Sequence, residues 1–246
     1  MLIGTLLIMA SFIKRSIVIP CYNEEGNLKK LILSCQEHLC SNFIEVILVD
    51  NGSTDGSQEI ISSLIGSNDL LKSIRVEKNI GYGNGILKGL KYATGDYIGW
   101  THADLQTDPK DVLRGFELMG DENSFVKGVR KGRGVSENFF TIGMAIFESF
   151  LLKTFLWEIN AQPTLFHKNF FTEWDSPPDD FSLDLFAYFF AKKHKLKIKR
   201  FKVNFSNRYS GKSSWNNGLL SKFILIKRTI IFSLKLSKKI NIKDLD

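Results

Sequence analysis

The chain lacks an apolar run long enough to cross a bilayer, although its first residues are apolar. Residues 1–13 form such a stretch, but a membrane-spanning helix needs ~20 apolar residues. The stretch also has no basic start and no small-residue cleavage site, so we expect no secretory signal peptide there. Residues 219–239 are too charged to span a bilayer. We therefore expect contact with a membrane only from its surface.

Cysteine and linker-like sequence are scarce as well. The three cysteines, Cys21, Cys35 and Cys40, form neither an even set nor the spacing of metal ligands, which favours free thiols in a reducing compartment. No stretch rich in proline, glycine and serine marks a linker or a disordered segment. With 246 residues, 43% of them hydrophobic, the chain can bury the core of one α/β domain, with or without a small appendage.

Acidic residues are fewer than basic ones. The 33 lysines and arginines exceed the 26 acidic residues and give a formal net charge of +7. This excess points to an anionic partner: nucleotide phosphate, an anionic membrane surface or nucleic acid. Much of it falls in residues 127–133 and 192–243. Because no aromatic stacking platform or recognised motif accompanies the charge, we expect no nucleic acid as a partner.

Strands and helices are expected to alternate through the first half of the chain. Short apolar runs predict strands at residues 16–19, 45–49, 74–77 and 97–100. Helical spacing predicts helices that end near residue 39, at residues 57–64 and at residues 81–92. This alternation favours a mainly parallel sheet with right-handed crossovers. Pro20, Asp50 and Asp104 follow the carboxyl ends of strands, where such sheets bind ligands.

The second half is less regular. We expect strands at residues 126–129 and 198–205, and helices at residues 136–154, 181–193 and 219–239. The helix at residues 181–193 carries Asp184. The last helix mixes apolar residues with lysines, as an amphipathic helix at an anionic membrane surface does; the alternative is a terminal helix packed on the domain.

A group of oxygen and nitrogen ligands follows the strand at residues 97–100. His102, Asp104 and Gln106 alternate there, and in extended backbone such residues share one face. A divalent metal that bridges a diphosphate binds oxygen donors of this kind. Taken alone, the triplet is weak, since Asp and Gln after a strand are more often plain loop residues.

Four segments together resemble the family 2 glycosyltransferases of the GT-A fold, most closely the polyprenyl-phosphate sugar transferase branch. They are SIVIPCYNEE at residues 16–25, VDNGSTDG at residues 49–56, ADLQ at residues 103–106 and RYSGKS at residues 208–213. The resemblance covers roughly residues 16–215. It implies an α/β GT-A domain over residues 1–215, with a mainly parallel central sheet flanked by helices. Residues 216–246 would then form a basic amphipathic helical tail.

The resemblance also implies a site for a nucleoside-diphosphate sugar. Its nucleotide-binding residues would be Pro20, Tyr22, Asn23, Glu24, Asp50 and Asn84. Mg²⁺ or Mn²⁺ would be held by Asp104 and Gln106, with His102 beside them. The leaving diphosphate would be neutralised by Arg130, Arg133, Arg208 and Lys212, since guanidinium groups suit phosphate oxygens. The candidate catalytic residues are Asp104, Asp184 and Arg208.

Several of these residues have plainer interpretations. Tyr22 and Asn23 can simply form the turn that ends the first strand. Asp50 and Asp55 can cap the following helix, and residues 130–133 can form a solvated loop. The glycines at residues 81–85 lack the spacing of a phosphate-binding loop, so we interpret them as tight packing at a helix start.

Two positions depart from the family pattern. His102 stands where the family commonly has the first Asp of an Asp-x-Asp motif, which removes one negative charge from the metal site. A neutral imidazole can still ligate a metal. Ser214 stands where the branch often has Lys, and Lys212 is the candidate replacement for that cation.

The implied reaction is transfer of a sugar, with inversion, from a UDP- or GDP-sugar to an acceptor. A hydroxyl acceptor needs a general base, whereas a lipid phosphate does not. Asn160 and Gln162 are amides and cannot act as bases, which leaves Asp179, Asp180 and Asp184. The absence of a clear base favours a polyprenyl phosphate, with another lipid or glycan of the cell envelope as the alternative. We expect a cytoplasmic protein at the cytoplasmic face of the membrane.

Two other functions remain open. The chain can be a nucleotide-sugar binding protein that has lost transfer activity, with His102 as the sign of that loss. It can also be a nucleotidyltransferase, but residues 16–27 lack the glycine-rich basic loop of those enzymes.

Overall fold

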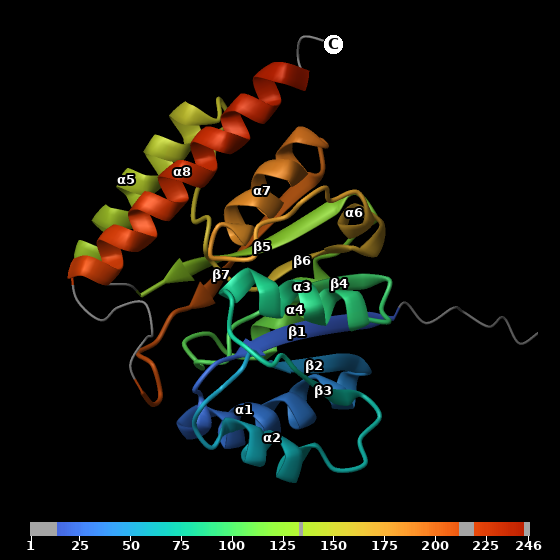
Figure 1. Cartoon of the computed structure of the whole chain (residues 1–246). Helices are drawn as coiled ribbons and strands as arrows, with labels where there is room; N and C mark the ends of the chain where they lie inside the picture. The colour runs from blue at the N-terminus through green and yellow to red at the C-terminus, as the bar shows by residue number, and fades with distance from the viewer. Residues whose placement is uncertain (1–13, 133–134, 212–218, 244–246) are drawn as a thin grey trace, which may run out of the picture.

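The central element of the computed structural model is a sheet of seven strands, drawn in Figure 1. The structure describes residues 14–132, 135–211 and 219–243. The strand order is β3-β2-β1-β4-β6-β5-β7. The strands are β1 (Arg15–Cys21), β2 (Ile44–Asp50), β3 (Leu71–Arg75), β4 (Tyr97–Trp100), β5 (Ser124–Lys131), β6 (Thr164–His167) and β7 (Lys197–Asn204).

The sheet is mainly parallel, as predicted. β1 pairs in parallel with β2 and β4, β2 with β3, and β5 with β7. β6 alone is antiparallel to its neighbours, β4 and β5. The sequence did not predict β6, and it placed β3 at residues 74–77. β3 is an edge strand in which only Leu71 is buried, so its apolar pattern is weak.

Helices cover both faces of the sheet. They are α1 (Glu25–His38), the 3₁₀ turn η1 (Cys40–Asn42), α2 (Ser57–Ile65), α3 (Tyr82–Tyr92), α4 (Lys110–Glu117), α5 (Val135–Leu151), α6 (Lys168–Thr172), α7 (Leu183–Lys193) and α8 (Leu219–Lys243). The expected helices are confirmed to within a few residues, and α4 and α6 were not predicted. None of the described helices is long and apolar enough to cross a membrane.

Two hydrophobic clusters hold these layers together. Along β1, Ile17 and Ile19 point into one cluster with residues of α1, α2 and α4, while Val18 points into the other with residues of α3 and α7. This alternation follows from the two-residue period of a strand. Both clusters are made of fully buried aliphatic and aromatic side chains, so the central strands are fixed on both faces.

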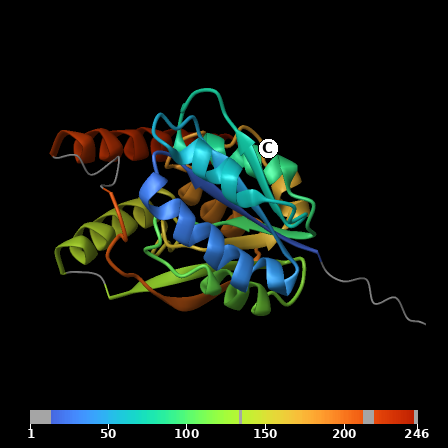
Figure 2. The ribbon, with the colours of Figure 1, turned by 90° about the horizontal axis from the view of Figure 1, so that it is seen from below.

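α5 and α8 extend beyond the sheet rather than lying flat on it (Figures 1 and 2). They meet near the end of α5, where Ser237 Oγ donates to the carbonyl of Leu151 at 3.4 Å. Phe232 and Leu236 of α8 also pack against the cluster of α3 and α7. Figure 2 shows the two helices diverging toward their amino-terminal ends. Met144 and Glu148 of α5 and Ile226 and Thr229 of α8 line one cavity there.

Candidate functional site

A cavity of about 560 Å³ lies beyond the carboxyl ends of β1, β2 and β4. One end is lined by Pro20 and Tyr22, which close β1, and the middle by Asp104. The other end is lined by Asp184 of α7 and, between α5 and α8, by Glu148. Parallel strands thus bring distant segments to one site, as a ligand site at the carboxyl edge of a sheet requires.

Three of the six predicted nucleotide-binding residues face this cavity and three do not. Pro20, Tyr22 and Glu24 line it. Asn23 instead ties two loops together: its backbone N–H donates to Ser53 Oγ at 3.1 Å, and its Oδ1 accepts from the backbone N–H of Thr54 at 2.9 Å. Asn23 has a φ of 54°, a left-handed conformation that Asn tolerates better than most residues.

Asp50 is buried behind the cavity. Its Oδ2 accepts from Arg75 Nη1 at 2.6 Å, and its Oδ1 accepts from the backbone N–H of Ser53 at 2.9 Å. The next residue, Asn51, lines the cavity and donates from Nδ2 to the carbonyl of Gly81 at 2.8 Å. The sequence did not single out Asn51, although its position directly after a strand end was the available signal.

The glycines at residues 81–85 act by close packing, as predicted. A Cβ on Gly81 would lie 2.2 Å from the carbonyl oxygen of Asp179, and one on Gly83 would lie 2.7 Å from the same peptide. Asn84 is buried there, and its backbone N–H donates to the carbonyl of Asp179 at 2.7 Å. Its side chain does not line the cavity.

His102, Asp104 and Gln106 all line the cavity, but not by the predicted geometry. β4 ends at Trp100, and Leu105 has a left-handed φ of 56°, so the expected extended backbone is wrong. A turn brings the residues together instead: the backbone N–H of Gln106 donates to Asp104 Oδ1 at 3.1 Å. The Gln106 side chain donates from Nε2 to the carbonyl of Ser206 at 3.3 Å, which fixes the segment after β7.

The donors at this turn fit a divalent cation that arrives with a diphosphate. Among the described residues, no group of three or more His, Cys, Asp and Glu side chains is placed to hold a metal by itself. Mg²⁺ is usually bound by one or two carboxylates together with substrate phosphates, and Asp104 supplies such a carboxylate. Burial in the cavity lowers the pKa of His102, against the opposing charges of Asp104 and Asp184, so the imidazole is neutral and able to ligate.

The predicted cations are held by acidic partners. Arg130 lines the cavity, and its Nε lies 2.7 Å from Glu158 Oε2. Arg208 lines it too and contacts the carboxylate of Glu24. Burial raises the pKa of Glu24, although a hydrogen bond from Asn27 and the charge of Arg208 oppose this. Arg133 and Lys212 lie outside the described residues, so their roles stay predictions.

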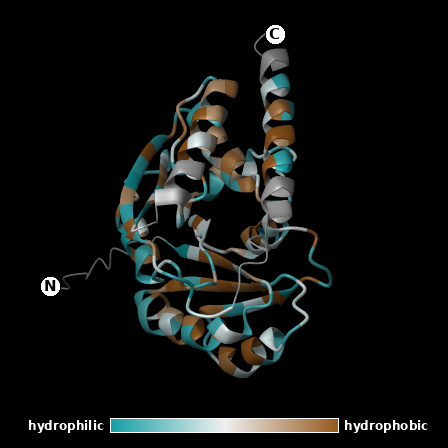
Figure 3. Cartoon of the chain, turned by 90° about the vertical axis from the view of Figure 1, so that its left-hand side faces the viewer, coloured by the Kyte–Doolittle hydropathy of each residue, from teal (hydrophilic) through white to brown (hydrophobic). Residues whose placement is uncertain are grey.

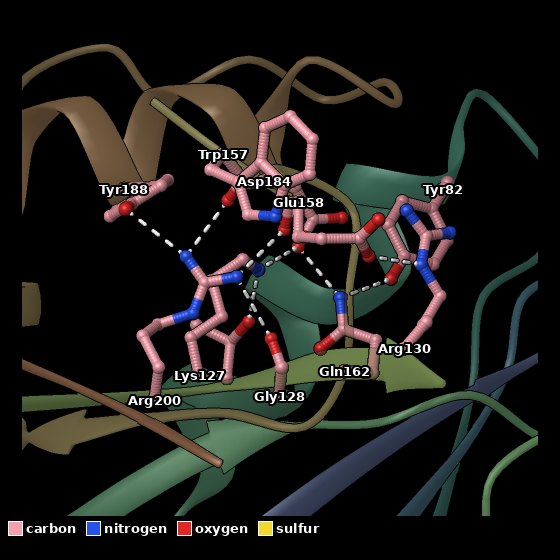
Figure 4. A network of polar contacts seen from close by, with 11 residues as sticks. Tyr82, Lys127, Gly128, Arg130, Trp157, Glu158, Gln162, Asp184, Tyr188 and Arg200 are labelled. Carbon is pink, nitrogen blue, oxygen red and sulfur yellow. Dashed lines mark hydrogen bonds and ion pairs between the residues drawn. The ribbon is translucent and has the colours of Figure 1, made fainter. Parts of the chain in front are cut away.

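Asp184, which the sequence suggested as a base or acceptor contact, lines the cavity, and Figure 4 shows the polar network behind it. Its Oδ1 accepts from Gln162 Nε2 at 2.6 Å and lies 3.3 Å from Lys127 Nζ. Asn160 and Asp180 line the cavity, whereas Asp179 contributes its carbonyl to the packing of α3. The sequence did not identify Lys127 as a partner of Asp184, because it lies in a run of basic residues.

Comparisons with known proteins agree with this geometry. The family model described as Glycosyl transferase family 2 matches residues 16–186. Undecaprenyl-phosphate 4-deoxy-4-formamido-L-arabinose transferase of Sodalis glossinidius is 32% identical over 126 residues, which are 49% of this chain and 38% of that protein. The transferase of the same name from Aeromonas hydrophila is 36% identical over 124 residues, or 48% and 37%. The chain thus aligns with well under half the length of these relatives.

A solved structure shows the same fold at low identity. Glucosyl-3-phosphoglycerate synthase from Mycobacterium tuberculosis, in complex with phosphoglyceric acid, superposes with a TM-score of 0.69. The identity is 17%, and the match covers 91% of this chain and 79% of that one. The predicted GT-A α/β fold is therefore confirmed. Because the family model spans more than half of the sequence, this chain belongs to glycosyl transferase family 2.

Proposed function

We propose that this chain transfers a sugar, with inversion at the anomeric carbon, from a nucleoside-diphosphate sugar to an acceptor. The observation that supports this best is the single cavity that runs from Pro20 and Tyr22, past Asp104, to Asp184. A donor stretched along it places its nucleotide at the end of β1 and its sugar near Asp184. Inversion needs one in-line attack, and a cavity with the acceptor arm opposite the nucleotide arm holds both reactants for it.

The residues of the cavity have separate tasks in this reaction. Tyr22 and Asn51 border the base and ribose, while Asn23 and Asp50 hold their loops in place from behind. Arg208 stabilises the negative charge that develops on the leaving diphosphate. Asp104 would hold a Mg²⁺ or Mn²⁺ ion, which when bound neutralises diphosphate charge. A related structure, of the synthase named above, was determined with Mn²⁺ and UDP.

A thermal-shift panel tests the donor assignment. UDP, GDP and their sugars, each with and without Mn²⁺, are compared by the melting temperature of the protein, since a bound ligand stabilises the folded state. We expect one nucleotide series to raise the melting temperature, and more strongly with Mn²⁺. If neither series does so, the proposal fails. Tight binding without any turnover would instead support a nucleotide-sugar binding protein.

For the acceptor we propose a polyprenyl phosphate. Two relatives that are 32% and 36% identical over about half of this chain are named for action on undecaprenyl phosphate. An anionic phosphate attacks without a general base. The test is transfer of radiolabelled sugar to undecaprenyl phosphate in detergent, with undecaprenol as the hydroxyl control. Transfer to undecaprenol alone would overturn the phosphate assignment.

We propose that α5 and α8 hold the protein at the cytoplasmic face of a membrane. Ile146 and Phe150, one turn apart on α5, are 64% and 86% exposed, and Phe155 beyond the helix is 72% exposed. Figure 3 shows apolar residues on both helices. Lysines on α8 and Lys153 accompany them, which suits an anionic lipid surface. The three cysteines are free and buried, which agrees with a reducing compartment.

Vesicle sedimentation tests this membrane surface. Wild-type protein is expected to sediment with anionic vesicles, less with neutral ones and less at high salt. A variant with Ile146→Ser and Phe150→Ser is expected to remain in the supernatant. Phe43→Ser is the matched control, because Phe43 is 81% exposed but follows η1, away from both helices. Equal loss of binding in both variants would contradict the assignment.

A further inference from the structure

Lys127 is a charged residue in a place that suits an apolar one. It lies in the middle of β5, its side chain is 0% exposed, and its neighbours Phe125 and Val126 belong to the two hydrophobic clusters. Burial of an ammonium group is costly unless the group is paired and hydrogen-bonded. Lys127 meets this requirement through two partners: Nζ lies 2.7 Å from Thr164 Oγ1 and 3.3 Å from Asp184 Oδ1 (Figure 4).

Lys127 and its neighbour Gln162 bind one carboxylate oxygen of Asp184 and leave the other oxygen unbound. Lys127 Nζ and Gln162 Nε2 both bind Oδ1, at 3.3 and 2.6 Å. Asp184 is 2% exposed and lines the cavity. Within the described part of the chain, only Oδ1 accepts hydrogen bonds, so Oδ2 is the oxygen available to the cavity. The carboxylate is therefore oriented from behind by two groups that do not compete for Oδ2.

The surroundings of Asp184 reinforce this orientation. Gln162 Nε2 also lies 3.5 Å from the Tyr82 hydroxyl. The Tyr82 ring stacks on Phe181, with centroids 4.9 Å apart, and lies 5.5 Å from the His102 ring. These three rings line the cavity. A ligand at this end thus meets aromatic walls and one oriented carboxylate oxygen, an arrangement that suits a hydroxyl-bearing ring better than an apolar chain.

Resting on the proposed transfer reaction, we propose that Lys127 is a positioning residue that holds Oδ1 of Asp184 and turns Oδ2 toward the cavity, where it accepts a hydrogen bond from a hydroxyl group. That hydroxyl belongs either to the sugar of the donor or to an acceptor that carries one, such as a glycan; the polyprenyl phosphate proposed above carries none. A carboxylate would repel a phosphate, so a hydroxyl is the group that this oxygen recognises. Lys127 itself touches no substrate, and its effect passes entirely through Asp184.

A double-mutant cycle tests this dependence. Lys127→Met, Asp184→Asn and the double variant are compared by calorimetric affinity and by turnover at saturating donor. A hydrogen bond to a charged group contributes about 1.5–3 kcal/mol, so we expect about a tenfold or larger loss in each single variant. In the Asp184→Asn background, Lys127→Met is expected to change nothing beyond about twofold. Independent, multiplying effects would overturn the proposal.

The source of the hydroxyl group is shown by whether Lys127→Met changes donor affinity or kcat. If the donor sugar supplies it, Lys127→Met weakens binding of the nucleotide sugar but not of the nucleoside diphosphate alone. If the acceptor supplies it, binding of both is unchanged and kcat falls. No change in either quantity would overturn the proposal. Failure of the proposed function looks different, since wild-type protein would then bind no nucleotide at all.

Stability is controlled within the same set of variants. Lys127→Met alone leaves Asp184 as an unpaired buried charge, which can prevent folding. The double variant removes both charges. Its activity can be compared with that of Asp184→Asn even when Lys127→Met does not fold. Equal activity of these two supports the proposal, and lower activity of the double variant overturns it. Lys131→Met, at the exposed end of β5, is the matched control and is expected to behave as wild type.

Discussion

Arg208, in the segment that follows β7, contacts the carboxylate of Glu24, 184 residues earlier in the chain. Next to this pair, Asn27 Nδ2 donates to the carbonyl of Ser210 at 3.2 Å, and Lys30 Nζ lies 4.2 Å from the Tyr209 ring. The other end of the segment is bound to Gln106. The segment therefore crosses the end of the cavity lined by Pro20 and Tyr22 and joins α1 to the turn that carries Asp104.

Replacement of Arg208 is expected to lower activity with the nucleotide sugar and to destabilise the segment that follows β7. Arg208→Ala removes charge-assisted hydrogen bonds worth about 1.5–3 kcal/mol, so kcat/KM for the nucleotide sugar should fall about 10- to 100-fold. Steady-state kinetics and the melting temperature measure the two effects. Arg114→Ala is the control, because the exposed Arg114 pairs with Asp111 of the same helix, α4, and does not line the cavity. An unchanged kcat/KM in Arg208→Ala would remove this residue from the proposed mechanism.

Exchange of His102 for an acid is expected to strengthen metal binding. His102→Asp places a second carboxylate beside Asp104, and an additional anionic oxygen ligand favours Mg²⁺ and Mn²⁺. We expect tighter Mn²⁺ binding in the presence of nucleoside diphosphate, measured by calorimetric titration. Asp104→Ala should abolish the metal-dependent part of nucleotide binding. If Asp104→Ala binds Mn²⁺ and nucleotide as wild type does, the assigned metal role is wrong.

Glu148 is expected to make the protein less stable as the pH rises. Burial raises its pKa to about 7, from an ordinary value of 4.5. Between these two pH values the folded state binds more protons than the unfolded state, so stability is lost as the pH rises through this window. The loss is complete above about pH 7 and amounts to at most about 3 kcal/mol.

The variant Glu148→Gln is expected to lack this loss. Ser233 Oγ donates to the carbonyl of Thr229 at 2.8 Å, so it can accept from a protonated Glu148 or from the amide of a Gln. Urea unfolding at pH 5 and pH 8 measures the difference. Wild type should lose stability relative to Glu148→Gln between the two pH values. Parallel changes in the two proteins would show that Glu148 does not titrate as described.

Two glycine substitutions are expected to act in opposite directions. A Cβ on Gly99 would lie 2.1 Å from the carbonyl oxygen of Thr164, between β4 and β6. Gly99→Ala should therefore destabilise the protein by about 1–3 kcal/mol. A Cβ on Gly143 of α5 meets nothing within 4 Å, so Gly143→Ala should stabilise the helix by about 0.5–1 kcal/mol. Thermal unfolding compares them, and equal effects would contradict the packing described for β6.

The parallel half of the fold was predictable because its signals are local. β1, β2 and β4 are short apolar runs that end in polar residues, and each lies close to its expected range. β6 was missed because four residues after a proline carry too little pattern, and only its pairing with β4 and β5 makes it a strand. Edge strand β3 was misplaced for a related reason, since its outer side chains are not buried.

The sequence predicted the site residues that lie near the ends of strands. It did not predict those whose role depends on contacts with residues far away in the sequence. Pro20, Tyr22 and Asp104 lie at or shortly after the ends of strands, and all three face the cavity. Asp50 and Asn23 lie in similar places, but Arg75 at the end of β3 and Thr54 in the loop after β2 bind them instead. Lys127 could not be recognised, because its burial depends on Asp184, which lies 57 residues away in sequence.

The reversed direction of β6 divides the cavity into two independently built halves. Parallel strands place residues at the cavity where they end, so the half of the cavity near Pro20 and Tyr22 is made by the loops that leave β1, β2 and β4. An antiparallel strand places residues at the cavity before it begins, and Ile159 and Asn160 line the cavity in the segment that leads into β6. Under the proposed function, the segment that leads into β6 can change in sequence between homologues and alter acceptor specificity. The loops that bind the donor can stay the same, because they leave other strands.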